Sequence, residues 1–254
     1  MSENDPKPTH FQGKDAVEHV IEAQARGIVA KAEAHGEEIP GSVASFADTA
    51  RETATLLTLL WAILYPLEIE QSKLILFAAV TLGWTIWRFG RSAWLGWSRL
   101  ERLHRLVAEE KWEIDHHRDQ EREELSALYE AKGFKGKLLE DVINVLMSDE
   151  DRLLRVMLEE ELGLTLEKQD HPLQLGLGAL IGALSSAALS LVGFALSPDY
   201  GLLAGAAVTI TAASIITATY NRNRRVSAVV WNLGLLALAG GMSFYLKDFL
   251  QRIL

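Results

Sequence analysis

Hydrophobic and polar residues alternate along the chain in long blocks. The C-terminal block, 172–250, is dominated by apolar residues and is interrupted by charges at few places. A helix needs roughly 20 apolar residues to cross a bilayer. The pattern therefore predicts three membrane-spanning helices in this block, over 172–196, 201–220 and 226–246.

A second apolar block, 53–97, predicts two further spans with weaker signals. The first, over 45–67, is strongly apolar only from Thr53 onward, which is short for a span. The second, over 74–89, runs into Trp and Arg residues, which are typical of a membrane–water interface. Together with the three C-terminal segments, these two make five predicted spans.

The block between the spans, 99–171, is rich in charged residues and predicts soluble helices. The first is expected to continue the second span and to extend about 55 Å from the membrane at 1.5 Å per residue. Gly133 and Gly136 predict its end, and Ser148 is expected to cap the third helix. The three predicted soluble helices cover 93–131, 137–147 and 148–163.

The sequence thus predicts an all-α protein, in which a five-helix transmembrane bundle carries a three-helix cytoplasmic domain between spans 2 and 3. Apolar residues at helical spacing also predict an amphipathic helix over 14–35. The predicted domains are an N-terminal region with this helix, spans 1 and 2, the acidic inserted domain, and spans 3 to 5, at 1–44, 45–97, 98–171 and 172–254.

Positive charges in the short loops predict the orientation. Arginines follow the second span, and three more lie between the fourth and fifth spans, at 222, 224 and 225, whereas the two other loops hold only Lys73. The positive-inside rule places such loops in the cytoplasm. We therefore expect a multi-pass integral membrane protein, in contact with lipid, whose N-terminus and inserted domain are cytoplasmic and whose C-terminus is outside.

The net charge of −9 belongs mainly to the inserted domain, because 109–170 holds 19 Asp and Glu against 9 Lys and Arg. Such a surface repels phosphates, which argues against nucleic acid as a partner, and it attracts cations. A charged surface that only keeps the domain soluble explains the composition equally well. The absence of cysteine excludes disulfides, iron–sulfur clusters and thiolate metal sites.

Small residues recur every four positions in the third span, at 178, 182, 186 and 190. This spacing favours close packing of helices. The packing is expected within one bundle, with contact between subunits as the alternative.

Four candidate metal ligands lie on the predicted long helix at helical spacing: Glu113, His117, Glu121 and Glu124. On a continuous helix they would share one face, where like charges repel unless a cation binds. Carboxylates with imidazole suit Fe²⁺, Mn²⁺ or Zn²⁺, and carboxylates alone suit Ca²⁺ or Mg²⁺. Spacing alone favours a solvated face neutralised by nearby Lys and Arg.

Further candidates lie elsewhere in the sequence. Met157 and Glu161 share a face of the third soluble helix, with Glu160 beside them. Asp48 and Glu52 share a face of the first span, where they either lie in the membrane and serve an ion path or merely precede a helix that starts near Thr53.

One pattern bears on enzyme activity. Glu113 and His116 have the Glu-x-x-His spacing of di-iron bundles, but such sites need two copies and the chain has one. The sequence therefore does not predict an enzyme.

The segment 121–164 reads EREELSALYEAKGF, then a short helix, then LMSDEDRLLRVMLEEELGL. It resembles the cytoplasmic metal-binding domain of the vacuolar iron transporter family. The resemblance implies five spans, a homodimer with ion passage between subunits, and transition-metal ligands at Glu113, Glu124, Met157 and Glu161, with His116 in the place of a family glutamate. The first two spans depart from the family's motifs.

The resemblance leads to a first hypothesis, a membrane transporter that exports Fe²⁺ or Mn²⁺, or Zn²⁺, from the cytoplasm in exchange for protons. Asp48 and Glu52 would take the ion into the membrane. The alternative is a transport-inactive membrane anchor that carries a metal-binding or protein-interaction module.

Overall fold

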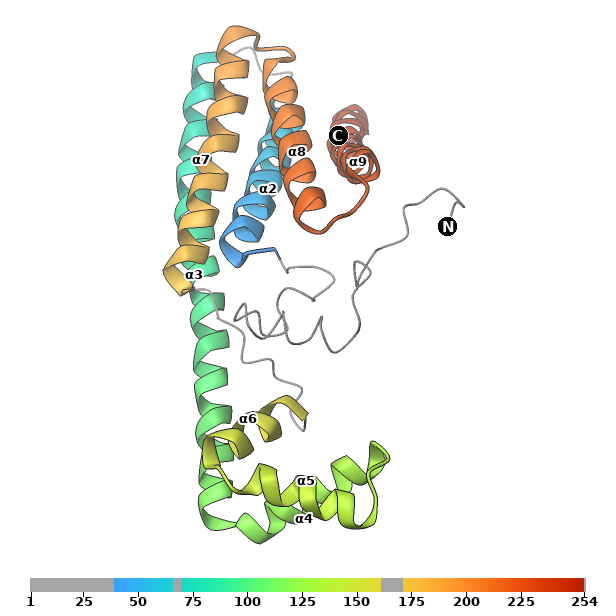
Figure 1. Ribbon diagram of the computed structural model, residues 1–254. Coiled ribbons are helices and arrows are strands. Elements are labelled where there is room, and N and C mark those ends of the chain that lie inside the picture. The colour runs from blue at the N-terminus through green and yellow to red at the C-terminus, as the bar shows by residue number, and fades with distance from the viewer. Residues whose placement is uncertain (1–38, 66–69, 161–170, 254) are drawn as a thin grey trace, which may run out of the picture.

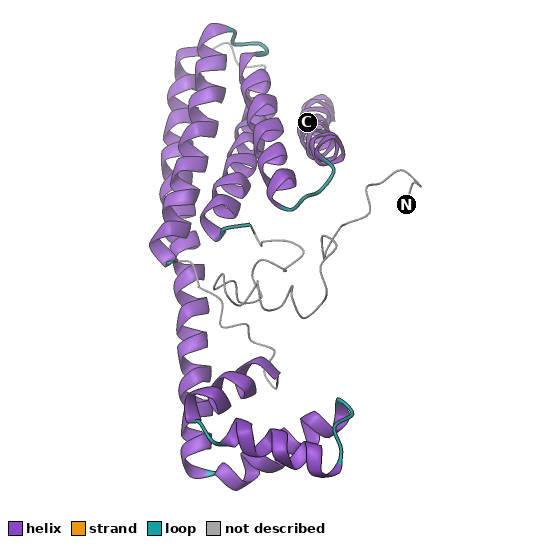
Figure 2. Cartoon of the chain, in the orientation of Figure 1, coloured by secondary structure: helices purple, strands orange, loops and turns teal. Residues whose placement is uncertain are grey.

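The computed structural model describes residues 39–65, 70–160 and 171–253, and these residues form helices joined by short loops (Figures 1 and 2). The predicted N-terminal helix over 14–35 lies outside the described residues. The helices are α2 (Gly41–Leu64), α3 (Glu70–His116), α4 (Arg118–Ala131), α5 (Gly136–Met147), α6 (Glu150–Glu160), α7 (Pro172–Leu196), α8 (Gly201–Tyr220) and α9 (Arg225–Ile253). The all-helical prediction is confirmed for this part of the chain.

Helices α2, α7 and α8 and the first half of α3 form a bundle (Figure 1). An apolar cluster of Leu57, Phe77, Phe194 and Leu202 joins all four helices and is almost fully buried. The rings of Phe77 and Phe194 meet edge to face with centroids 5.2 Å apart. Because each helix contributes to this cluster, none of the four can be removed without exposing the others.

Glycines on α7 allow its close approach to α2. A Cβ atom at Gly178 would collide with the backbone carbonyl of Ser42, and one at Gly182 with that of Phe46. The main chains are therefore in direct contact, which only a residue without a side chain permits. The expectation that the small residues of α7 serve packing within one bundle is confirmed at these two positions.

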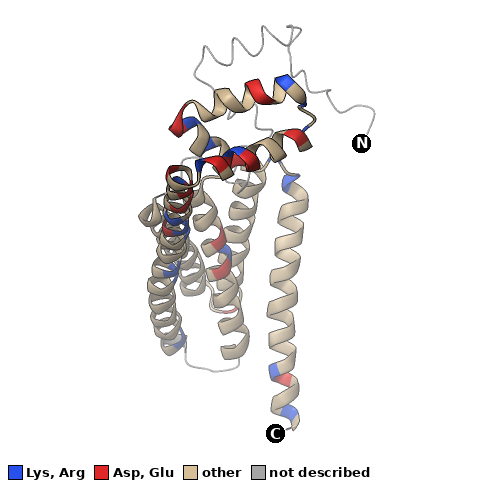
Figure 3. Cartoon of the chain, turned by 90° about the horizontal axis from the view of Figure 1, so that it is seen from below, with Lys and Arg blue, Asp and Glu red and all other residues tan. Residues whose placement is uncertain are grey.

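Among the helices that the structure describes, α7, α8 and α9 are long and apolar enough to cross a membrane. Helices α2 and α3 pack beside α7 but carry charged residues, so the five-span arrangement remains a prediction. Helix α9 contacts α8 and α2. Its axis makes a large angle with those of the other bundle helices, because α9 is seen nearly end-on in Figure 1 and along its length in Figure 3. Most of its apolar side chains are exposed, as expected of a surface that faces lipid.

Helix α3 extends far beyond the bundle and carries α4, α5 and α6 at its far end, where the charged residues gather (Figures 1 and 3). The predicted continuous helix over 93–131 is wrong, because the chain bends at His117, between α3 and α4. On a straight helix Ile114 and Leu125 would lie about 16 Å apart. The bend places both in one apolar core.

The remaining boundaries of this domain follow local chemistry. Gly133 and Gly136 adopt positive φ angles of 100° and 57°, and the turn that they form separates α4 from α5 as predicted. The expected cap at Ser148 is displaced by one residue, because the Oδ1 atom of Asp149 accepts a hydrogen bond from the backbone N–H of Arg152 at 2.8 Å. The described part of α6 ends at Glu160.

Candidate metal centre

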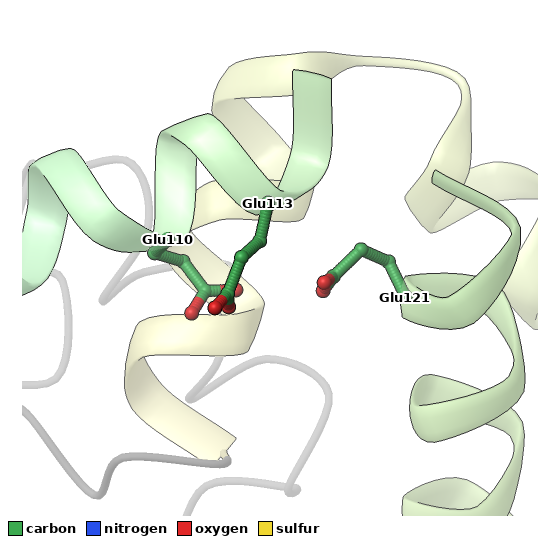
Figure 4. Close-up of side chains that lie close together, drawn as sticks. All are labelled: Glu110, Glu113 and Glu121. Carbon is green, nitrogen blue, oxygen red and sulfur yellow. The ribbon is translucent and has the colours of Figure 1, made fainter. Parts of the chain in front are cut away.

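Three glutamates from two helices converge at the bend between α3 and α4 (Figure 4). Glu110 and Glu113 lie one turn apart near the end of α3, and Glu121 lies in the first turn of α4. One carboxylate oxygen from each lies within 4.8 Å of the others. A single cation could contact all three side chains.

The bend itself creates this group. His117 has φ −127° and ψ 35°, outside the helical region, and its backbone N–H still donates to the carbonyl of Glu113 at 2.7 Å. Its own carbonyl accepts from the N–H groups of Gln120 and Glu121, at 2.8 and 3.2 Å, which starts α4. On a straight helix Glu113 and Glu121 would lie about 12 Å apart, too far to share an ion.

Two of the three glutamates are buried. Glu110 and Glu121 are each 4% exposed, whereas Glu113 is open to solvent. Burial of a carboxylate is costly unless it is paired, hydrogen-bonded or bound to a metal. Three carboxylates are a ligand set for hard divalent cations such as Mn²⁺ and Mg²⁺, and an added imidazole or thioether shifts the preference toward softer transition metals.

The two histidines are arranged around an aromatic side chain and lie outside this group. The His116 ring stacks on Trp112 with centroids 4.5 Å apart, and its Nδ1 atom lies 2.8 Å from the Trp112 carbonyl oxygen. The His117 ring meets Trp112 edge-on at 5.4 Å. Both histidines and Glu124 are exposed. Of the four residues predicted to share one helix face, the structure therefore brings together only Glu113 and Glu121.

The candidates on α6 have different surroundings. Met157 is fully buried in the apolar core that also holds Ile114 and Leu125. Glu160 forms an ion pair with Lys132, at the end of α4. Glu161 lies outside the described residues.

Sequence reasoning missed Glu110. The candidate ligands predicted at helical spacing run from Glu113 toward the C-terminus of one straight helix and do not include Glu110. A signal was present, because Glu110 precedes Glu113 by three residues and so shares its face of α3. Its neighbour Glu109 is exposed and lies 4.0 Å from Arg105 on the same helix.

In the bundle, each of the two candidate ion-path carboxylates has an arginine partner. Asp48 pairs with Arg51 at 2.6 Å, and the Glu52 Oε2 atom lies 2.9 Å from the Nε atom of Arg88. Asp48 and Glu52 both line a cavity of about 450 Å³ between α2, α3 and α9. Asn232 of α9 lines the same cavity, and sequence reasoning missed it because only the fold brings α9 to α2.

The comparison with protein families found a match that covers the inserted domain. No curated protein matches the chain. The sequence model described as the VIT family matches residues 96–247, which include all three glutamates, helices α4 to α8 and most of α9. The match begins after α2, at the end of the part of α3 that packs against α7. The chain therefore belongs to the VIT family, the vacuolar iron transporters, a family of membrane metal-ion transporters.

Proposed function

We propose that this protein is a multi-pass membrane transporter that exports Fe²⁺ or Mn²⁺ from the cytoplasm in exchange for protons. The observation that carries the proposal is the group of Glu110, Glu113 and Glu121, three carboxylates of the family-matched domain within 4.8 Å of one another. Carboxylates this close together attract a divalent cation strongly, because all three attract the ion at short range.

The carboxylate group would collect the ion in the cytoplasm. In this proposal the thioether of Met157, which lies in the core that holds Ile114, adds a soft ligand that favours transition metals over Ca²⁺ and Mg²⁺. Glu124, Glu160 and Glu161 would supply the surrounding negative field during loading, and the exposed His116 and His117 would supply exchangeable ligands.

The route through the membrane would pass the cavity that Asp48 and Glu52 line. Intramembrane carboxylates are costly and are usually retained for function. Both residues lie in α2, which contacts α7 and α8, two of the three strongly apolar helices. An ion that leaves the cytoplasmic domain would thus meet oxygen ligands within the bundle.

The proposed arrangement has five spans, α2, the first half of α3, α7, α8 and α9, in a homodimer. Two side-chain contacts are consistent with α2 and α8 running in opposite directions across the membrane, as this arrangement requires. The Arg51 guanidinium lies 3.4 Å from the hydroxyl of Thr217, near the cytoplasmic end proposed for α8, and the Trp61 indole lies 3.4 Å from the carbonyl of Pro198, at the opposite end.

Transport can be measured with the full-length protein in liposomes that contain a Mn²⁺-sensitive dye and a pH-sensitive dye. We expect Mn²⁺ flux with opposite proton movement, and a large loss of flux in the variant E110Q/E113Q/E121Q. The matched control E123Q changes an exposed glutamate of α4 that has no part in the proposed site and should transport normally. Flux that is equal in the triple variant and the wild type would refute the role of the carboxylate group.

A transport-inactive metal-binding module is the second candidate function. The observation that favours it is the pairing of both Asp48 and Glu52 with arginines, which neutralises the candidate path. In that case the full-length protein would bind Mn²⁺ in calorimetry, E110Q/E113Q/E121Q would not, and neither would produce flux.

A further inference from the structure

Arg88 of α3 is a buried cation inside the helical bundle. The residue is 6% exposed, and its guanidinium reaches across to α2. The Nη2 atom donates to the Thr49 hydroxyl at 2.9 Å, and the Nε atom lies 2.9 Å from Glu52 Oε2. Arginine stays protonated in proteins, so this positive charge is permanent.

Glu52 lies between this fixed charge and an open cavity. Its side chain is 44% exposed, and it lines the cavity of about 450 Å³ together with Asp48. Arg88 itself is not among the lining residues. The Glu52 carboxylate can therefore be approached by Arg88 from the protein interior and by a dissolved ion from the cavity.

We propose that Arg88 is a resident competitor for the transported cation at Glu52, an inference that rests on the proposed route through this cavity. Without a metal ion, Arg88 neutralises Glu52. A divalent ion in the cavity must draw the carboxylate away from the guanidinium, so Arg88 lowers the affinity of the bundle for the ion and permits its release.

Thr49 allows this exchange without freeing the arginine. Its side chain is fully buried, and its hydroxyl accepts from both Nε and Nη2 of Arg88, at 3.3 and 2.9 Å. The guanidinium thus keeps a partner when Glu52 turns to the cavity.

A separate contact holds the two helices together when Arg88 is changed. The Trp84 indole N–H donates to the Thr53 hydroxyl at 3.1 Å, one turn away from the Arg88 contacts on both helices. We therefore expect α2 and α3 to stay in place in the variant R88Q.

The test measures Mn²⁺ flux of the full-length protein in liposomes as a function of Mn²⁺ concentration. We expect R88Q to lower the half-saturating concentration by at least about fivefold, the lower end of typical couplings between two ligands. The matched control R99Q removes an exposed arginine further along α3 and should leave the value unchanged. In R88Q/E52Q the gain should vanish, because the shared carboxylate is gone. A half-saturating concentration in R88Q that equals or exceeds the wild-type value overturns the proposal.

Two further measurements separate this inference from the proposed function. The chain has no cysteine, so T55C places a single thiol in the wall of the cavity. If the wild type transports no Mn²⁺, the proposed transport is refuted. The effect of Arg88 on Mn²⁺ binding is then tested by itself, through the Mn²⁺ concentration that protects this thiol from a maleimide. Protection at lower Mn²⁺ in R88Q supports the inference, and equal or absent protection overturns it.

If R88Q does not yield a folded protein, T49V tests the same exchange in the opposite direction. Without the hydroxyl, Arg88 depends more on Glu52, so we expect the half-saturating Mn²⁺ concentration to rise at least about fivefold. An unchanged or lower value overturns the proposal.

Discussion

The carboxylates of Glu113 and Glu121 lie within 4.8 Å of each other, although the two residues are eight positions apart along a charged, helix-forming stretch. The bend at His117 accounts for this proximity. It also buries Ile114 and Leu125 in one core, so the apolar contacts that fold the domain hold the two carboxylates close together. A cation bound between them would be attracted by both.

Replacement of Glu121 by glutamine should weaken the binding of Mn²⁺ at least about tenfold. Loss of a residue that only hydrogen-bonds to a metal ligand already lowers metal affinity roughly 10–100-fold, and Glu121 is proposed as a direct ligand. Calorimetry of the full-length protein in detergent measures the effect. E123Q makes the same change at an exposed position of α4 outside the proposed site and should bind within about twofold of the wild type. Equal loss in the two variants would mean that general charge, rather than this site, attracts the ion.

Binding of Mn²⁺ should raise the thermal stability of the protein. A ligand at 100 times its Kd stabilises the folded state by about 2.7 kcal/mol. We expect Mn²⁺ to raise the unfolding temperature midpoint of the wild type but not that of E110Q/E113Q/E121Q. Tryptophan fluorescence measures the unfolding. A rise that persists in the triple variant would place the stabilising ion elsewhere.

The change of Met157 to leucine separates a packing role from a ligand role. Leucine has a similar volume, so the fold should lose less than about 1.5 kcal/mol. The sulfur is lost, and we expect the preference for Fe²⁺ over Mg²⁺ to fall, as measured by competition between the two ions in calorimetry. An unchanged preference would limit Met157 to the apolar core, where it is fully buried.

Replacement of Gly182 by alanine should destabilise the bundle by about 1–3 kcal/mol, the usual cost of overpacking. The added methyl group would meet the backbone of Phe46, which cannot move aside as a flexible side chain would. In G83A the methyl group meets nothing within 4 Å, so stability should be unchanged or should rise by up to about 1 kcal/mol. The unfolding midpoint in detergent compares the two variants, and equal midpoints would contradict the close contact of α7 with α2.

Single cysteines in the connecting loops test the predicted orientation. A membrane-impermeant maleimide should label D199C, between α7 and α8, on intact cells. It should label N223C, between α8 and α9, and K135C, between α4 and α5, only after permeabilisation. The absence of native cysteine removes background labelling. Labelling of D199C and N223C from the same side would exclude α8 as a membrane span.

The sequence by itself determined the elements whose signals are local. The predicted segments 172–196 and 201–220 coincide with α7 and α8 residue for residue, because uninterrupted apolar runs end at polar or turn-forming residues. Glycines at 133 and 136 marked the turn after α4 for a similar reason, since they supply positive φ angles. The segment 121–164 also resembled the vacuolar iron transporter family, and the family match confirms that resemblance.

Only the tertiary structure decided which charged groups meet. Helical spacing pairs residues three or four apart, and it could not bring Glu121 to Glu110 or Arg88 to Thr49. The contact of Glu121 with Glu110 required the bend at His117, which is stabilised by the apolar core that Ile114 and Leu125 share. The contact of Arg88 with Thr49 required α2 and α3 to lie side by side. Local patterns fix where helices form, whereas the burial of apolar side chains between helices fixes which polar groups they bring together.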